Sequence, residues 1–282
     1  MATQTERKIN LLARNLPEGL LVDSAWLSRH GYSTALRSQY VAAGWLEQPA
    51  RRVYRRPRGS LRWQQVVISL QTMLDCPLAV GGRTALDLHG YAHYLSQATS
   101  EVHLYGPKAP PRWLQGLRVH ARFVYHSDRR LFTKAILAEN PSDLTAKLAA
   151  KSSAASGLPH AAFTVLTWGQ WDWPLLLSTP EKAMLELLDE LPKRESFHQV
   201  DKLFEGAANL SPRRLQALLA DCRSVKAKRL FFYFADRHQH AWLKQIKREA
   251  IALGTGKRML VKGGKLDAAH GITVPEDMDG VP

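Results

Sequence analysis

The sequence predicts an α+β fold, in which an N-terminal winged helix-turn-helix precedes a larger mixed α/β domain whose C-terminal part is helical. Three observations support this prediction. Two helical segments flank a turn at Gly31–Ser33 and lead into a basic hairpin, strand-like runs follow up to about residue 178, and helical periodicity takes over after Pro180. The chain of 282 residues fits two domains, which we place at 1–62 and 63–282.

The first two helices are expected before residue 31. Apolar residues recur at helical spacing from Ile9 and stop at the Pro17–Gly19 break. Asp23 is a suitable N-cap for a second helix over 24–30, and Gly31 suits the left-handed conformation of a tight turn.

A third helix, over 34–43, is expected to enter a DNA groove. Ser33 is a good N-cap for it and is also an expected DNA contact. At about 100° per residue, Thr34, Arg37 and Ser38 share a small, polar and cationic face. The major groove admits such a helix, and the arginine is suited to contact guanine edges or phosphate.

A basic hairpin follows the third helix and predicts a wing. Residues 45–48 and 53–55 read as short strands, joined by a loop over 49–52. Cations there are expected to contact phosphates and make binding depend on salt. The expected wing contacts are Arg51, Arg52 and Arg55.

Charge is concentrated in two regions, which favours nucleic acid as the partner. The chain carries a formal charge of +14, and residues 1–63 hold 11 Lys or Arg against 4 Asp or Glu. Residues 193–265 hold 17 against 6. A linker is expected at Arg55–Ser60, where Pro and Gly interrupt the periodicity.

Other features narrow the class of protein. No apolar run approaches the ~20 residues that span a bilayer, and Met1–Asn10 is polar, so we expect a cytoplasmic protein without membrane contact. Cys76 and Cys222 stand apart, which predicts reduced thiols rather than a disulfide or a zinc site.

The larger domain is expected to be mixed α/β to about residue 178. Helices are predicted at 62–75 and 84–89, and strands at 78–80, 101–105, 117–125, 163–168 and 173–177. Pro180 begins the mainly helical part. Its expected helices cover 181–190, 197–207, 212–222, 226–236 and 242–252.

Five segments of the chain carry recognisable motifs, at 27–33, 44–47, 51–55, 82–90 and 178–183. Together they resemble the AbiEi-type antitoxins of abortive-infection, type IV toxin-antitoxin systems. This resemblance implies a repressor that binds inverted repeats upstream of its own operon, and a C-terminal domain that opposes a co-encoded nucleotidyltransferase-like toxin without a stable complex. The wing departs from the family in one respect, because Arg51 and Arg52 stand where a glycine is often found.

Several motifs suggest chemistry, but each has a structural interpretation that we favour. Gly254–Lys257 lacks the first glycine and the final Ser or Thr of a phosphate-binding loop. His238 and His240 have no third metal ligand at a suitable spacing, and His89 is more typical of a hydrogen-bonded core histidine than of a catalyst. We therefore expect no catalytic residue, metal or cofactor. The tryptophans at 168–173 suit sheet packing better than base stacking.

A second basic surface is expected on the C-terminal helices, where cations alternate with apolar residues. It is either a solvated face or a second polyanion site. The expected members are Arg213, Arg214, Lys226, Lys228 and Arg229. The leading hypothesis is a non-enzymatic repressor and antitoxin. The alternative is an RNA-binding or nucleic-acid-modifying enzyme that its N-terminal module targets.

Overall fold

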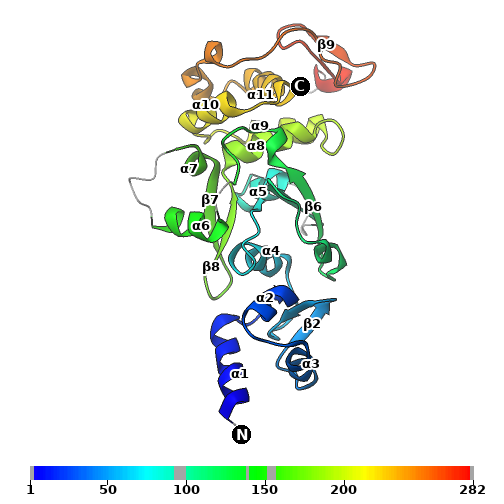
Figure 1. Cartoon of the computed structure of the whole chain (residues 1–282). Coiled ribbons are helices and arrows are strands. Elements are labelled where there is room, and N and C mark those ends of the chain that lie inside the picture. The colour runs from blue at the N-terminus through cyan, green and yellow to red at the C-terminus, as the bar shows by residue number, and fades with distance from the viewer. Residues whose placement is uncertain (1–2, 92–99, 138–139, 151–156, 280–282) are drawn as a thin grey trace.

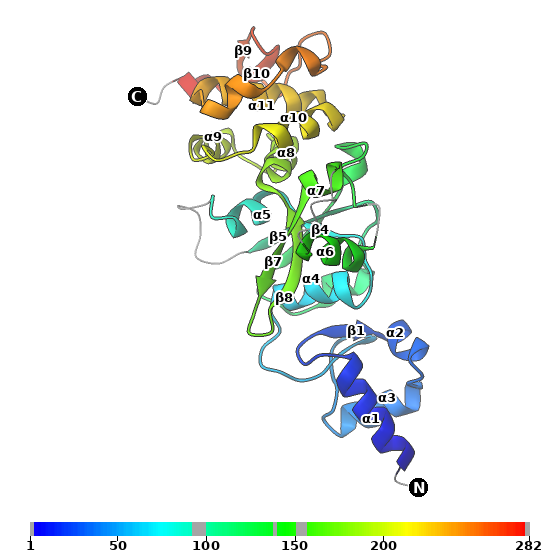
Figure 2. The ribbon, with the colours of Figure 1, turned by 90° about the vertical axis from the view of Figure 1, so that its left-hand side faces the viewer.

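The computed structural model describes residues 3–91, 100–137, 140–150 and 157–279. It is elongated, with an N-terminal module at one end, a sheet domain in the middle and a helical part at the other end (Figures 1 and 2). The mixed α+β composition predicted from the sequence is confirmed.

The N-terminal module alternates helices and short strands around a small sheet. Its antiparallel strands lie in the order β1-β3-β2. The first strand, Leu21–Asp23, was not predicted from the sequence. The elements are α1 Thr3–Asn15, β1 Leu21–Asp23, α2 Ser24–Arg29, α3 Thr34–Ala42, β2 Glu47–Ala50 and β3 Val53–Arg55.

The expected linker is fastened to the module that it follows. Arg56 donates hydrogen bonds to the carbonyl oxygens of Ala13 and Leu16 and pairs with Glu18 at 3.1 Å. Arg58 pairs with the same carboxylate at 3.1 Å. These contacts hold the connection to the next domain against the end of α1.

The sheet domain is built on five strands in the order β6-β5-β4-β8-β7. Two neighbouring pairs, β5 with β6 and β4 with β8, run parallel, and the other pairs are antiparallel. The strands are β4 Ala79–Val80, β5 Glu101–Gly106, β6 Arg122–Ser127, β7 Phe163–Trp168 and β8 Trp173–Ser178. The strand expected at 117–125 begins later, because a 3-10 helix at Arg112–Gly116 and an irregular segment precede it.

Helices pack on this sheet and complete its hydrogen bonding. α4 and α6 contact β8, whereas α5 contacts β5 and α8. The amide of Gln71 in α4 donates to the carbonyl oxygens of Leu78 and Leu176 and accepts from the Leu176 backbone N–H. Its side chain thus satisfies backbone groups beyond the end of the two-residue β4. The helices are α4 Trp63–Thr72, α5 Gly82–Leu88, α6 Pro141–Ala149 and α7 Leu158–Ala162; neither α6 nor α7 was predicted.

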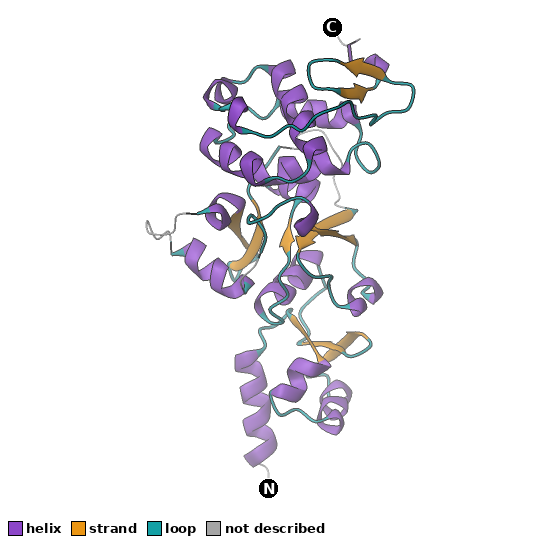
Figure 3. Cartoon of the chain, turned by 45° about the horizontal axis from the view of Figure 1, so that its top comes forward, coloured by secondary structure: helices purple, strands orange, loops and turns teal. Residues whose placement is uncertain are grey.

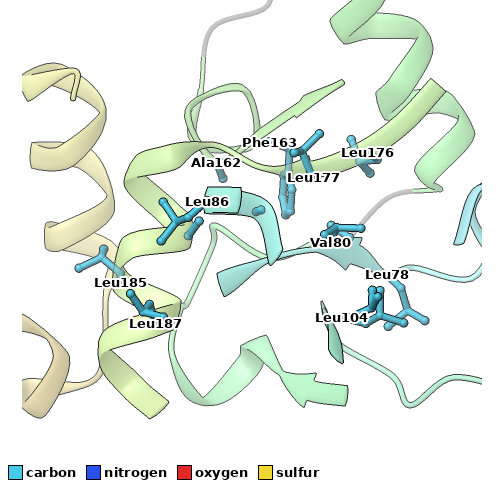
Figure 4. Packing of buried hydrophobic residues seen from close by; sticks show 14 of the residues in the cluster. Leu78, Val80, Leu86, Leu104, Ala162, Phe163, Leu176, Leu177, Leu185 and Leu187 are labelled. Carbon is cyan, nitrogen blue, oxygen red and sulfur yellow. The ribbon is translucent and has the colours of Figure 1, made fainter. Parts of the chain in front are cut away.

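Buried aliphatic side chains join the sheet to its helices. Val80, Leu104 and Leu177 project from three adjacent strands, and Leu86 and Leu185 lie on α5 and α8, two helices that contact each other (Figure 4). All five are fully buried. Their burial removes apolar surface from water and fixes how the helical part is attached to the sheet.

The C-terminal part is mainly helical (Figure 3), as predicted. Its helices are α8 Pro180–Glu190, α9 Phe197–Glu205, α10 Pro212–Asp221 and α11 Val225–His238. The single helix expected at 242–252 is wrong, because this stretch forms two 3-10 helices, Ala241–Gln245 and Arg248–Ala250. Between these turns the Lys247 N–H donates a hydrogen bond to the side chain of Gln216 in α10. In a continuous helix this N–H would bond to a carbonyl oxygen of the same helix. An antiparallel hairpin, β9 Lys265–Asp267 and β10 Ile272–Val274, follows.

Burial raises the pKa of Cys76 to about 11 and that of Cys222 to about 12, so both thiols stay protonated at neutral pH. Within the described residues, no helix is long and apolar enough to cross a membrane.

Candidate nucleic-acid interface

The turn between α2 and α3 has the predicted caps. Asp23 accepts a hydrogen bond of 2.7 Å from the Trp26 N–H at the start of α2. Ser33 accepts one of 3.3 Å from the Leu36 N–H at the start of α3. Gly31 has φ +80° between the two helices, a conformation that favours glycine. Local sequence therefore fixes how α3 leaves α2.

The exposed stripe of α3 is rotated from the predicted face. Thr34 and Ser38 are exposed as expected, and Gln39 lies beside them. The capping residue Ser33 is exposed as well. The full exposed stripe is Thr34, Ala35, Ser38, Gln39 and Ala42. It is polar and short, so it permits the close approach that groove reading requires.

Arg37 does not belong to this stripe, because it is only 7% exposed. Its guanidinium donates to the carbonyl oxygen of Ser24 at 2.9 Å and to the Thr34 hydroxyl at 2.8 Å. The guanidinium also lies 6.0 Å from the ring centre of Tyr54 in β3. The expectation that this arginine faces a groove is therefore corrected: its donors are engaged inside the module.

The hairpin carries two exposed cations at its tip. Arg51 and Arg52 form the turn between β2 and β3, and both are exposed. Arg52 takes φ +64°, so an arginine adopts the left-handed conformation that glycine would favour. Its carbonyl oxygen accepts from the Ser24 N–H at 2.8 Å, which ties the tip to the start of α2.

Arg55 is turned away from the tip. It is buried, pairs with Glu47 at 2.6 Å and donates to the carbonyl oxygen of Gly59 at 2.7 Å. Of the three expected wing cations, Arg51 and Arg52 are exposed, whereas Arg55 joins the hairpin to the segment that follows it.

The expected second basic surface is not a single surface. Arg213 and Arg214 are exposed at the start of α10, but Lys228 and Arg229 are 6% and 5% exposed in α11. Lys226 is half-buried and donates to the carbonyl oxygens of Asp189 and Leu191.

Arg229 has a structural role that its burial makes possible. Its guanidinium donates to four backbone carbonyl oxygens, at distances of 2.6 to 3.1 Å. These belong to Leu253, Gly254, Gly256 and Gly271. The Gly254–Lys257 segment that resembles a phosphate loop thus presents carbonyl oxygens to an arginine, and the same arginine fastens the β9–β10 hairpin.

The two motifs at 82–90 and 178–183 meet inside the protein. Lys182 is fully buried, pairs with Glu186 and donates to the Ser178 hydroxyl. Glu186 also accepts from the Gly82 N–H at 2.8 Å. The Lys182 ammonium lies 4.8 Å from the ring centre of Phe163, so aromatic faces complete its surroundings. Sequence reasoning did not identify this buried pair.

The histidines set aside as structural are hydrogen bonded. His89 donates from Nε2 to the carbonyl oxygen of Ser178 at 3.0 Å, and burial lowers its pKa. His238 lies 2.8 Å from Asp201, and His240 lies 2.6 Å from the carbonyl oxygen of Phe204. Among the described residues, no three His, Cys, Asp or Glu side chains are grouped to hold a metal ion.

The tryptophans at 168–173 border the linker. Trp168 and Trp173 stack with ring centres 6.1 Å apart across the β7–β8 pair. Trp171 is 60% exposed, and the Arg58 guanidinium lies 5.2 Å from its ring centre.

Two family models match the chain in separate parts. Residues 5–97 match the N-terminal domain of the AbiEi antitoxin transcriptional regulators, and residues 164–275 match the transcriptional regulator, AbiEi antitoxin, of type IV toxin-antitoxin systems. The chain belongs to the AbiEi antitoxin family. The resemblance stated from the sequence is confirmed, and the N-terminal match of this AbiEi chain includes α3 and the basic hairpin.

One solved structure supports the fold of this AbiEi chain along almost its whole length. The crystal structure of the RV2827C protein from Mycobacterium tuberculosis covers 95% of this chain and 90% of its own, with 16% sequence identity and a TM-score of 0.52. A comparison with the curated proteins found no match.

Proposed function

We propose that the N-terminal module is a winged helix-turn-helix that binds operator DNA, and that the chain represses its own operon. One observation carries this proposal: the exposed polar stripe of α3 belongs to the same small module as a hairpin whose tip presents Arg51 and Arg52. A helix in the major groove with a basic hairpin on the backbone is a known mode of DNA binding.

The proposed DNA contacts divide into base recognition and phosphate binding. Thr34 and Ser38 have short hydroxyl side chains that allow close approach to base edges. The amide of Gln39 is suited to a pair of hydrogen bonds with adenine. Arg51 and Arg52 supply charge for phosphates. Ser33 caps α3 at the edge of this surface, whereas Arg37 and Arg55 hold the surface in shape from inside.

The rest of the chain is proposed to be the antitoxin. We infer that it opposes a co-encoded nucleotidyltransferase-like toxin without a stable complex and without catalysis of its own. Family membership supports this role, and the buried Lys182–Glu186 pair supports a structural use of the domain's central charges.

A binding assay with the protein's own promoter tests the repressor proposal. Full-length protein is titrated into the labelled promoter fragment and into a scrambled fragment of equal length, at near-physiological salt, and fluorescence anisotropy is followed. Specific binding predicts at least about a 10³-fold preference for the promoter. Equal affinity for the two fragments would show that α3 reads no sequence.

A further inference from the structure

A hollow of about 350 Å³ lies where the sheet domain meets the helical part. The strands β5 and β6 are parallel and end there together, since Gly106 pairs with Ser127 at the end of their register. Ligands in open α/β sheets bind outside the carboxyl ends of such strands. The end of α8 and the start of α11 close the other side, with Glu190 and Lys226 among the lining residues.

Cations dominate the lining of this hollow, which we call the strand-end pocket. Arg130 and Lys193 line it and are exposed, and within the described chain neither makes a hydrogen bond or ion pair. Arg194 lies at 3.7 Å from Glu190, and Lys226 is held by backbone carbonyl oxygens. Arg130 and Lys193 are therefore free to bind an anion, whereas Arg194 and Lys226 are engaged within the protein.

The carboxylates of the pocket are already engaged with the protein. Asp189 accepts from the Ser224 hydroxyl at 2.9 Å. Glu190 accepts from His126 Nδ1 at 2.9 Å. Lys226 lies 3.7 Å from Asp189 and Arg194 lies 3.7 Å from Glu190, so these two cations offset the two carboxylates, and the charges of Arg130 and Lys193 remain for an entering anion.

The half-buried ring of Tyr125 lies at the boundary between the pocket and a second hollow. Tyr125 and Arg194 line both hollows, and the second hollow also includes Phe123 and Gln115. The Tyr125 hydroxyl donates to the carbonyl oxygen of Gly106 at 3.0 Å, which fixes its ring at the boundary. A ligand with one polyanionic end and one flat aromatic end matches this arrangement.

We propose that the strand-end pocket binds a nucleoside triphosphate. Its phosphates lie against Arg130 and Lys193, and its base lies beside Tyr125 in the second hollow. The helices α8 and α11, which contribute to the lining of the pocket, lie on the far side of the sheet domain from α3 (Figure 1). A nucleotide bound there would be a small-molecule ligand separate from the proposed DNA-binding surface, and its binding does not depend on DNA binding.

Isothermal titration of the full-length protein with ATP, GTP, CTP, UTP and pyrophosphate tests the proposal. At least one nucleoside triphosphate is expected to bind, and the double variant Arg130→Ala, Lys193→Ala is expected to weaken it at least tenfold. The variant Arg258→Ala, Lys262→Ala removes the same charge from exposed positions that do not line either hollow, so it is the matched control. Tyr125→Ala should weaken the nucleotide but not pyrophosphate.

Three results would overturn the proposal. The first is no binding of any nucleoside triphosphate at millimolar concentration. The second is equal weakening by the pocket and control variants, which would indicate diffuse charge attraction only. The third is equal affinity for pyrophosphate and nucleotide with no effect of Tyr125→Ala, which would remove the base site. Circular dichroism of each variant confirms that losses are not unfolding.

Discussion

Arg37 donates a hydrogen bond of 2.9 Å from its guanidinium to the carbonyl oxygen of Ser24, so the middle of α3 is joined to the first turn of α2. We expect Arg37→Ala to lower the stability of the N-terminal module by about 2 kcal/mol, because hydrogen bonds to charged groups are worth about 1.5–3 kcal/mol. Thermal melting of the full-length protein should show an earlier transition. If Arg37→Ala leaves the melting temperature unchanged but removes the sequence preference, Arg37 contacts DNA bases directly.

Gln39 and Arg51 separate base reading from phosphate binding. Gln39→Ala is expected to cost about 1–3 kcal/mol of operator affinity and to relax the sequence preference at one position. Arg51→Ala should weaken all sequences alike and reduce the salt dependence by about one counterion. Titrations at several salt concentrations with matched and mismatched operators measure both effects. Identical behaviour of the two variants would contradict the division.

Local signals in the sequence predicted the turn between α2 and α3 well. Asp23 and Ser33 bond to N–H groups only three residues away, so the residue types alone indicate the caps. Gly31 marks the turn for a similarly local reason. The larger helices and most strands also follow from periodicity, because each has a buried side.

The direction of long cationic side chains could not be predicted in the same way. Arg229 bonds to carbonyl oxygens up to 42 residues away, and a sequence gives no sign of such partners. Arg37 seemed exposed because a charged residue is usually solvated. Gln39 was not predicted as a DNA contact because the orientation of α3 was not known. The burial of Arg37 and Tyr40 sets that orientation and leaves Gln39 on the exposed side.

The loss of charge at Arg229 should lower stability, whereas the same change at Arg213 should not. Arg229→Gln leaves carbonyl oxygens of the 253–271 segment unpaired, and we expect at least about 2 kcal/mol of destabilisation with loosening of the β9–β10 hairpin. Arg213→Gln is the control, since this side chain is exposed. Urea unfolding gives the stabilities, and hydrogen exchange locates the loosened segment. Equal stability of the two variants would contradict the structural role of Arg229.

His103 should make stability depend on pH. Burial, together with His126, lowers its pKa to about 4 from 6.5, so between these values the unfolded chain binds a proton that the folded protein does not. Stability is therefore complete above about pH 6.5 and is lost as the pH falls towards 4. Asp87 acts in the opposite sense, because burial raises its pKa to about 6.

The variant His103→Gln isolates the histidine from this opposing effect. Asp87 is present in both proteins, so its contribution largely cancels in the difference between them. From pH 7.5 to pH 4.5, the wild type should lose about 2 kcal/mol more of its free energy of unfolding than the variant does. Urea unfolding at the two pH values measures this difference. Parallel losses in both proteins would show that His103 is not held neutral.

Repression and toxin antagonism are expected to lie on different parts of the chain, because the α3 surface and the helical part occupy opposite ends of an elongated molecule (Figure 2). The full-length variant Gln39→Ala, Arg51→Ala, Arg52→Ala keeps the internal contacts of Arg37 and Arg55, so it should fold while losing promoter binding. Expressed from an unrelated promoter at unchanged protein level, it should still rescue cells from the proposed co-encoded toxin. Arg213→Glu with Arg214→Glu should keep promoter binding, since both side chains are exposed on α10, a helix that lies far from α3 (Figure 1). If the N-terminal variant folds normally but fails to rescue, antagonism requires DNA binding, and the two functions share one surface.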